Sequence, residues 1–112
     1  MTHRASRILV ALTIAIAGVL ATSAPASAQR ALQQVLDLNR QAMDAYNNLE
    51  VEQAMTLLQQ ALQAAQRGRV TGAPLARTYM NLGVVSIGGM GDNAGGLDYF
   101  VQSLQALSLI HI

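Results

Sequence analysis

The fold that we expect for this chain is indicated most clearly by residues 77–100, RTYMNLGVVSIGGMGDNAGGLDYF. Apolar residues recur at helical spacing on both sides of a glycine-rich interruption, GGMG at 88–91, and consecutive glycines weaken a helix. The pattern predicts a helix over 74–87 and a second over 94–107, with Asp92 or Asn93 as the N-cap of the second. The residues expected to face the core of this pair are Leu75, Thr78, Tyr79, Leu82, Val85 and Ser86 in the first helix, and Leu97, Phe100, Val101 and Leu104 in the second.

The preceding residues predict another helix pair of the same kind. Helices are expected over 30–47 and 51–66, joined by a short turn at Asn47–Leu49. The linker 67–72 separates the pairs, with Gly68 expected just past the end of one helix and Thr71 as a cap of the next. The stripes that we expect to be buried are Leu32, Val35, Leu36, Asn39, Ala42, Met43 and Tyr46, and then Ala54, Leu57, Leu58, Ala61, Leu62 and Ala65.

The predicted fold class is therefore all-α, with two antiparallel helix pairs at about 30–66 and 74–106. The second pair resembles a tetratricopeptide repeat (TPR) in its Tyr79-x-x-Leu82-Gly83 opening and its Gly91-Asp92 turn. Further likeness lies in the second helix, at Phe100, Ser103 and Leu104. Departures from the family pattern are Ser86 in place of a tyrosine, Gly96 in place of an alanine, and a spacing longer than the roughly 34 residues of that repeat.

This resemblance implies function by binding. Repeats of this kind stack into a solenoid whose concave surface is lined by the first helix of each pair. The residues that would contact a protein or peptide partner are Arg77, Met80, Asn81 and Val84. For Asn81 two roles stay open: a hydrogen bond to the backbone of a bound peptide, or a hydrogen bond inside the repeat itself.

The N-terminal segment 1–28 has the layout of a secretory signal peptide. Arg4 and Arg7 precede the apolar run Ile8–Ala21, and Ala26-Ser27-Ala28 fits the small-x-small cleavage pattern. We expect cleavage before Gln29 and an exported product, periplasmic or extracellular in a Gram-negative bacterium, with no membrane segment left. An uncleaved N-terminal anchor is the alternative. The sequence of the second pair also resembles those of exported repeat proteins of myxobacteria.

The C-terminal residues 107–112 read LSLIHI, which differs in character from the sequence before them. The same six residues result from translating the end sequence of a widely used sequencing-transposon adapter. We therefore expect natural sequence to stop near Ala106, so that the chain is a C-terminally truncated fragment. The alternative is a natural apolar C-terminus.

Composition argues against several classes of site. The chain has no Cys, and its two His, His3 and His111, lie outside 29–106. Thiolate, zinc and histidine-based catalytic sites are therefore not expected in 29–106, and we expect no cofactor. Five Arg against six acidic residues in 29–106 form no basic cluster, so no nucleic-acid partner is expected. The GGMGDNAGG segment lacks the Lys-Ser/Thr ending of a phosphate-binding loop.

The expected function is that of an exported TPR-like scaffold for protein–protein interaction, without catalysis. The alternative is an N-terminal helical module of a larger enzyme or envelope assembly protein whose active domain lies elsewhere. Two helix pairs are few for a solenoid, because repeats need neighbours to cover their apolar faces. We therefore expect 29–106 alone to be weakly stable or to self-associate.

Overall fold

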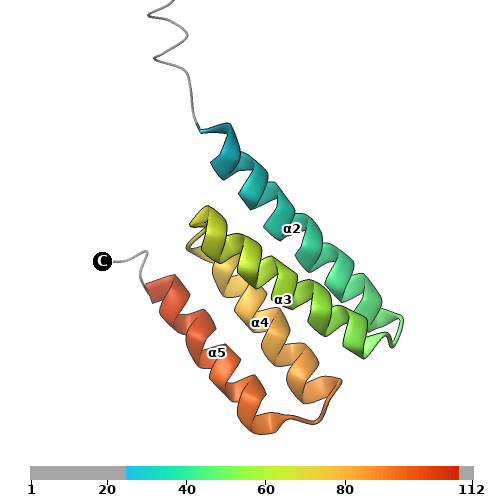
Figure 1. Ribbon diagram of the computed structural model, residues 1–112. Coiled ribbons are helices and arrows are strands. Elements are labelled where there is room, and N and C mark those ends of the chain that lie inside the picture. The colour runs from blue at the N-terminus through green and yellow to red at the C-terminus, as the bar shows by residue number, and fades with distance from the viewer. Residues whose placement is uncertain (1–24, 109–112) are drawn as a thin grey trace, which may run out of the picture.

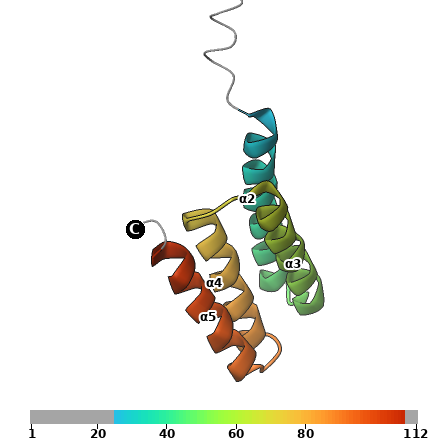
Figure 2. The same cartoon turned by 60° about the vertical axis from the view of Figure 1, so that its left-hand side comes forward.

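Four helices make up the part of the protein that a computed structural model describes, residues 25–108. They are α2 (Ala26–Asn47), α3 (Val51–Gly68), α4 (Ala73–Gly88) and α5 (Asn93–Ser108). Helix α2 packs against α3 and α4 against α5, while α4 also contacts both helices of the first pair (Figures 1 and 2). The prediction of an all-helical chain with two packed helix pairs is confirmed.

Helix α2 starts four residues before the predicted position, because Pro25 and the residues after it suit a helix start. The fixed φ of proline, here −62°, fits the position before the first turn, and the Pro25 carbonyl accepts a hydrogen bond from Ala28 N at 3.1 Å. Ala26, Ser27 and Ala28 are thus helical and exposed. The rest of the predicted signal peptide, 1–24, and the last four residues of the suspected adapter tail, 109–112, lie outside the described residues.

Two helices end in left-handed residues that are not glycine. Leu49 (φ 65°) follows α2 and Arg69 (φ 55°) follows α3. In both cases the next amide closes the turn: Glu50 N donates to Ala45 O at 2.9 Å, and Val70 N donates to Ala65 O at 2.8 Å. This is the Schellman arrangement, whose left-handed position normally holds glycine.

The prediction that Gly68 occupies that position was wrong. Gly68 is instead the last residue of α3, and a Cβ there would overlap the Cβ of Ala31 on α2. Close approach of the two helices, and not a left-handed φ, therefore accounts for a glycine at residue 68.

The predicted caps of the second pair are right for one helix and wrong for the other. Thr71 does not cap α4; Gly72 holds that position, with φ 75° and no side-chain cap. Asp92 caps α5, because its Oδ1 accepts a hydrogen bond from Gly95 N at 3.0 Å.

Small residues dominate the core between the pairs. The central cluster combines Ala42 and Ala45 of α2, Ala54 and Leu58 of α3, and Leu82 and Val85 of α4. A smaller cluster of Val35, Ala64 and Ala65 lies nearer the linker end, with Val70 and Leu75 packed against it. Alanines allow helix axes to approach closely, so the first pair and α4 share the central cluster.

The crossing of α4 and α5 is a contact between two glycines. A Cβ on Gly83 would lie 2.5 Å from Phe100 Cε1 and 3.0 Å from the carbonyl oxygen of Gly96. A Cβ on Gly96 would in turn lie 3.0 Å from the carbonyl oxygen of Gly83. Gly83 and Gly96 thus permit the close approach of α4 and α5.

The face of α5 that packs on α4 differs from the predicted one. Its buried residues are Gly96, Ser103 and Ala106, and the buried Ser103 hydroxyl donates to the carbonyl oxygen of Ala76 at 2.8 Å. Three of the four residues predicted to face the core are exposed instead: Leu97 (60%), Val101 (51%) and Leu104 (68%). Only small side chains fit where the two backbones are this close, so the large ones are turned outward.

No described helix, from α2 to α5, is both long enough and apolar enough to cross a bilayer.

Replacing Gly83 by Ala should destabilise the fold although alanine favours helix. Overpacking costs about 1–3 kcal/mol, and the better helix propensity of Ala returns about 1 kcal/mol. We expect a net loss of up to about 2 kcal/mol, measured by denaturant unfolding. The exposed α3 position Gln60 supplies the control: the difference between Gln60→Ala and Gln60→Gly isolates the propensity effect. A Gly83→Ala protein more stable than the parent would contradict a tight crossing.

Replacing Leu49 by Gly should stabilise the fold, because the left-handed conformation costs a non-glycine residue about 1–2 kcal/mol. Leu49 is 87% exposed, so little packing is lost with its side chain. Part of the gain is offset by the greater entropy of glycine in the unfolded chain, and we expect a net gain of about 0.5–1 kcal/mol. Met90→Gly, at an exposed turn residue with negative φ, is the matched control and should not stabilise. Equal effects of the two substitutions in thermal unfolding would refute this explanation.

Candidate partner-binding groove

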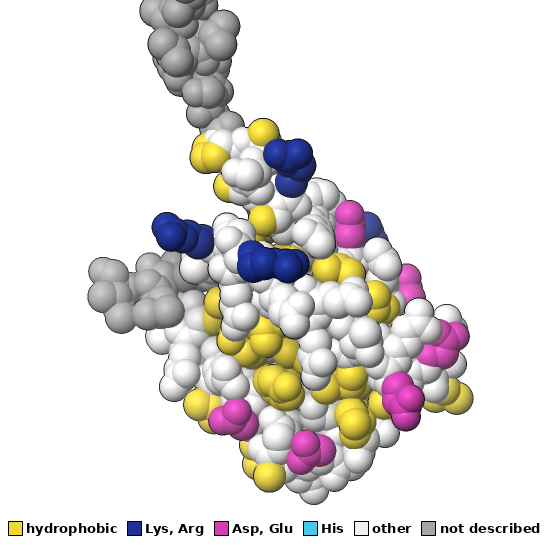
Figure 3. All heavy atoms as spheres, viewed as in Figure 1, with side chains coloured by type: hydrophobic (Ala, Val, Ile, Leu, Met, Phe, Trp, Pro, Cys, Tyr) yellow, Lys and Arg dark blue, Asp and Glu magenta, His cyan; other side chains and the backbone are white. Residues whose placement is uncertain are grey.

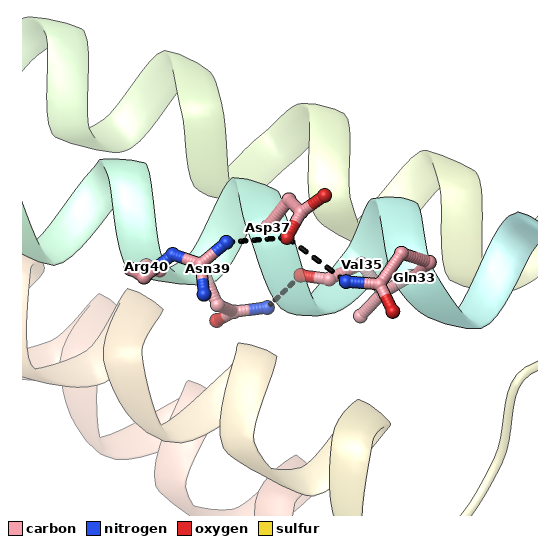
Figure 4. Close-up of polar contacts among 5 residues, drawn as sticks. All are labelled: Gln33, Val35, Asp37, Asn39 and Arg40. Atoms are coloured by element: carbon pink, nitrogen blue, oxygen red, sulfur yellow. Dashed lines mark hydrogen bonds and ion pairs between the residues drawn. The ribbon is translucent and has the colours of Figure 1, made fainter.

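The side chain of Asn39 is buried in the middle of α2, at the junction of the two helix pairs. It is only 4% exposed, although it lies in an otherwise apolar stripe. Its Nδ2 donates to the carbonyl oxygen of Val35 at 2.9 Å, one turn earlier in the same helix (Figure 4). A buried amide without partners would be costly, so its remaining hydrogen-bonding capacity must be met from α4.

Two side chains of α4 meet that need. Asn39 Nδ2 also donates to Thr78 Oγ1 at 2.9 Å, and Asn39 Oδ1 accepts a hydrogen bond from Asn81 Nδ2 at 2.9 Å. The Thr78 hydroxyl itself donates to the carbonyl oxygen of Pro74 at 2.9 Å. Both amide hydrogens and the oxygen of Asn39 are thus used, and no buried side-chain N or O atom in residues 25–108 lacks a partner. This network, Asn39–Thr78–Asn81, fixes α2 and α4 to each other in register.

A groove of about 420 Å³ runs between α2 and α4 beside this network. Its lining residues, from both helices, are Leu36, Asn39, Arg40, Met43, Asp44, Arg77 and Asn81. The groove therefore combines apolar side chains and one carboxylate of α2 with guanidinium and amide groups from both helices. Such a surface offers both apolar contact and oriented hydrogen-bond donors.

The two arginines of the groove differ in their partners. Arg40 forms an ion pair with Asp37 at 2.5 Å, and Asp37 also accepts a hydrogen bond from Gln33 (Figure 4). It is the only ion pair among the described residues, so Arg77 enters the groove without a carboxylate partner from residues 25–108. Its charge is available to an acceptor group that binds in the groove.

Two of the four predicted contact residues line the groove, and two do not. Arg77 and Asn81 line it, while Met80 is exposed and Val84 half-buried on α4 without lining it. For Asn81, the hydrogen bond inside the protein is present, although it joins the two pairs and does not stay within one. This hydrogen bond uses Asn81 Nδ2, so Asn81 Oδ1 has no hydrogen-bond partner among the described residues.

Sequence reasoning missed the contribution of α2, namely Leu36, Asn39, Arg40, Met43 and Asp44. One signal was present: Asn39 is the single polar residue in the predicted apolar stripe of its helix. A polar residue at such a position is buried only with partners, and these come from a helix far along the chain.

No group of three or more acidic, His or Cys side chains that could hold a metal ion occurs within the described part of the chain.

Comparison with protein-family models, with curated proteins and with solved structures finds no match to this chain. The resemblance to a repeat family therefore rests on the sequence itself, chiefly on the residues of the second helix pair.

Replacing Thr78 by Val should destabilise the junction by about 1–2 kcal/mol, because it removes the hydroxyl at nearly constant shape and leaves an Asn39 hydrogen unpaired. Asn39→Ala should cost about 1–3 kcal/mol. Since both changes break the same contact, we expect the double variant to cost clearly less than the sum of the single ones. Additive losses in denaturant unfolding would show that the Asn39–Thr78 hydrogen bond does not couple α2 to α4.

Proposed function

We propose that this protein is an exported, TPR-like binding scaffold without catalytic activity, which takes up an extended segment of a partner protein in the groove between α2 and α4. The observation that carries the proposal is the groove itself, in which Arg77 and Asn81 of one helix pair face Leu36 and Met43 of the other. Export is supported by the two arginines, the apolar run and the small-x-small site of the N-terminal sequence.

The lining favours a peptide over a compact ligand. The groove is partly open to solvent, and its polar side chains come from two different helices. Asn81 offers a free amide oxygen and lies one turn from Arg77, so the two could engage a backbone N–H and an acidic or carboxyl-terminal group of one extended chain. Leu36 and Met43 would contact an apolar side chain of the same segment, and the flexible methionine adapts to its shape.

Helical repeats bind in this manner because their first helices present one continuous surface. Here α2 and α4 hold the corresponding places in the two pairs, and the Asn39–Thr78–Asn81 network keeps them rigid. Rigid walls reduce the entropy lost on binding, which supports recognition of a flexible peptide.

The proposal is tested by selecting peptides from a display library on the purified protein and measuring their affinity by fluorescence anisotropy. Arg77→Glu should weaken the selected peptides at least about tenfold, because it turns an attraction into a repulsion in the groove. Arg67→Glu, which makes the same charge reversal on the exposed surface of α3, is the matched control and should leave the affinity unchanged. Selected peptides that bind the parent and the Arg77→Glu variant equally, or a library that yields none, would refute the groove as the binding site.

A further inference from the structure

The outward face of α5 is an apolar stripe without a neighbour in the described structure. Ala94, Leu97, Val101 and Leu104 are all exposed and follow one another at steps of three, four and three residues. Among the described helices α5 contacts only α4, and it forms one edge of the molecule in both ribbon views (Figures 1 and 2).

Helix α3 provides an internal comparison. It is the second helix of the first pair, as α5 is of the second, and it is packed on both sides, by α2 and by α4. No large hydrophobic residue of α3 is exposed, whereas α5 exposes Leu97, Val101 and Leu104. Within one protein, therefore, the covered helix hides its large apolar side chains and the uncovered helix displays them.

The residue types of the stripe indicate which kind of neighbour fits it. The buried residues of α3 are mostly alanines, Ala54, Ala61, Ala64 and Ala65 around Leu58, which suit the close packing of stacked pairs. The α5 stripe has leucine, valine and leucine at alternating four- and three-residue steps. This is the spacing of a coiled-coil seam, in which large side chains from two helices interdigitate.

Charge is distributed unevenly along the helix axes, between the two ends of the molecule. The end with the α2–α3 and α4–α5 turns carries five of the acidic residues, Asp44, Glu50, Glu52, Asp92 and Asp98. The end with the α3–α4 linker carries four of the arginines, Arg30, Arg67, Arg69 and Arg77. Figure 3 shows this separation on one face, with arginines near the start of α2 and the linker and acidic side chains toward the turns.

We propose that the α5 stripe binds a second copy of this chain, α5 against α5 in antiparallel orientation about a two-fold axis near Val101. An antiparallel pair sets Leu97 of each copy toward the Leu104 end of the other, and it brings the acidic end of each protomer beside the basic end of its partner. A parallel pair would place the acidic ends together and both Asp98 carboxylates at the same level. Charge complementarity therefore selects the antiparallel arrangement, less strongly as salt is added.

The proposed interface leaves the groove between α2 and α4 free, since α5 lines no part of it. Pairing through α5 thus does not depend on the proposed peptide binding, and each copy in the pair keeps its own groove. Because the stripe is short, the dimer is weaker than one with an interface of standard size.

Sedimentation velocity on the full chain, expressed from its complete coding sequence and run from low micromolar to several hundred micromolar, tests the proposal. We expect a monomer–dimer equilibrium. Val101→Glu should raise the dimer dissociation constant at least about tenfold, since it sets two carboxylates near the axis. Gln60→Glu on α3 adds the same charge elsewhere and should leave the equilibrium unchanged. Circular dichroism of each variant confirms that the helices are retained.

Orientation is tested separately with a spin label at a single cysteine, Asn93→Cys, at the exposed start of α5 in a chain that has no other cysteine. In the antiparallel pair the two labels lie at opposite ends of the seam, about 24 Å apart along the axis; in a parallel pair they lie side by side. A monomer at every concentration, a dimer that withstands Val101→Glu, or side-by-side labels would each overturn the proposal. In any of these cases the α5 stripe would bind another partner, such as a helix of a different protein.

Discussion

The contact between Gly83 and Gly96 is the constraint on which the arrangement of the second helix pair depends. Each glycine leaves room for the carbonyl oxygen of the other, so the two backbones approach more closely than any side chain would allow. Ser103, about two helix turns further along, then donates a hydrogen bond to the carbonyl oxygen of Ala76. Together these contacts fix how α5 is rotated about its own axis, with its small residues inward and its large apolar residues outward.

The junction between the pairs depends on a different kind of interaction. Apolar packing among alanines holds the helices close but specifies position along the axes weakly, because a stripe of similar small side chains fits in more than one register. The buried amide of Asn39 removes that freedom, since it is satisfied only when Thr78 and Asn81 lie opposite it. The groove lined by Arg77 and Asn81 exists in its present form because this register is fixed.

These two constraints place the two proposed interaction surfaces on different elements. The α2–α4 groove combines charge, amide groups and a methionine, which suits an extended peptide held by a few directed contacts. The α5 stripe is almost purely apolar with regular spacing, which suits another helix. A scaffold with both surfaces would pair through α5 while each copy keeps a free groove.

The sequence alone determined the helices, the turns and the small residues at the helix crossings. Periodic apolar residues, the glycines at 88–91 and the Asp92 cap are local features, and each acts within a few residues of itself. Glycines at 83 and 96 could also be assigned to close packing, since a helix interior otherwise disfavours them.

Contacts between helices, and not local sequence, determine which stripe of α5 is buried and what Asn39 does. Hydrophobicity favoured Leu97, Val101 and Leu104 as the core face, but the distance between α4 and α5 leaves no room for them there. The role of Asn39 likewise depends on partners 39 and 42 residues away, which no local pattern contains. Periodicity shows that a helix has an apolar side, whereas the space beside the neighbouring helix determines which side is covered.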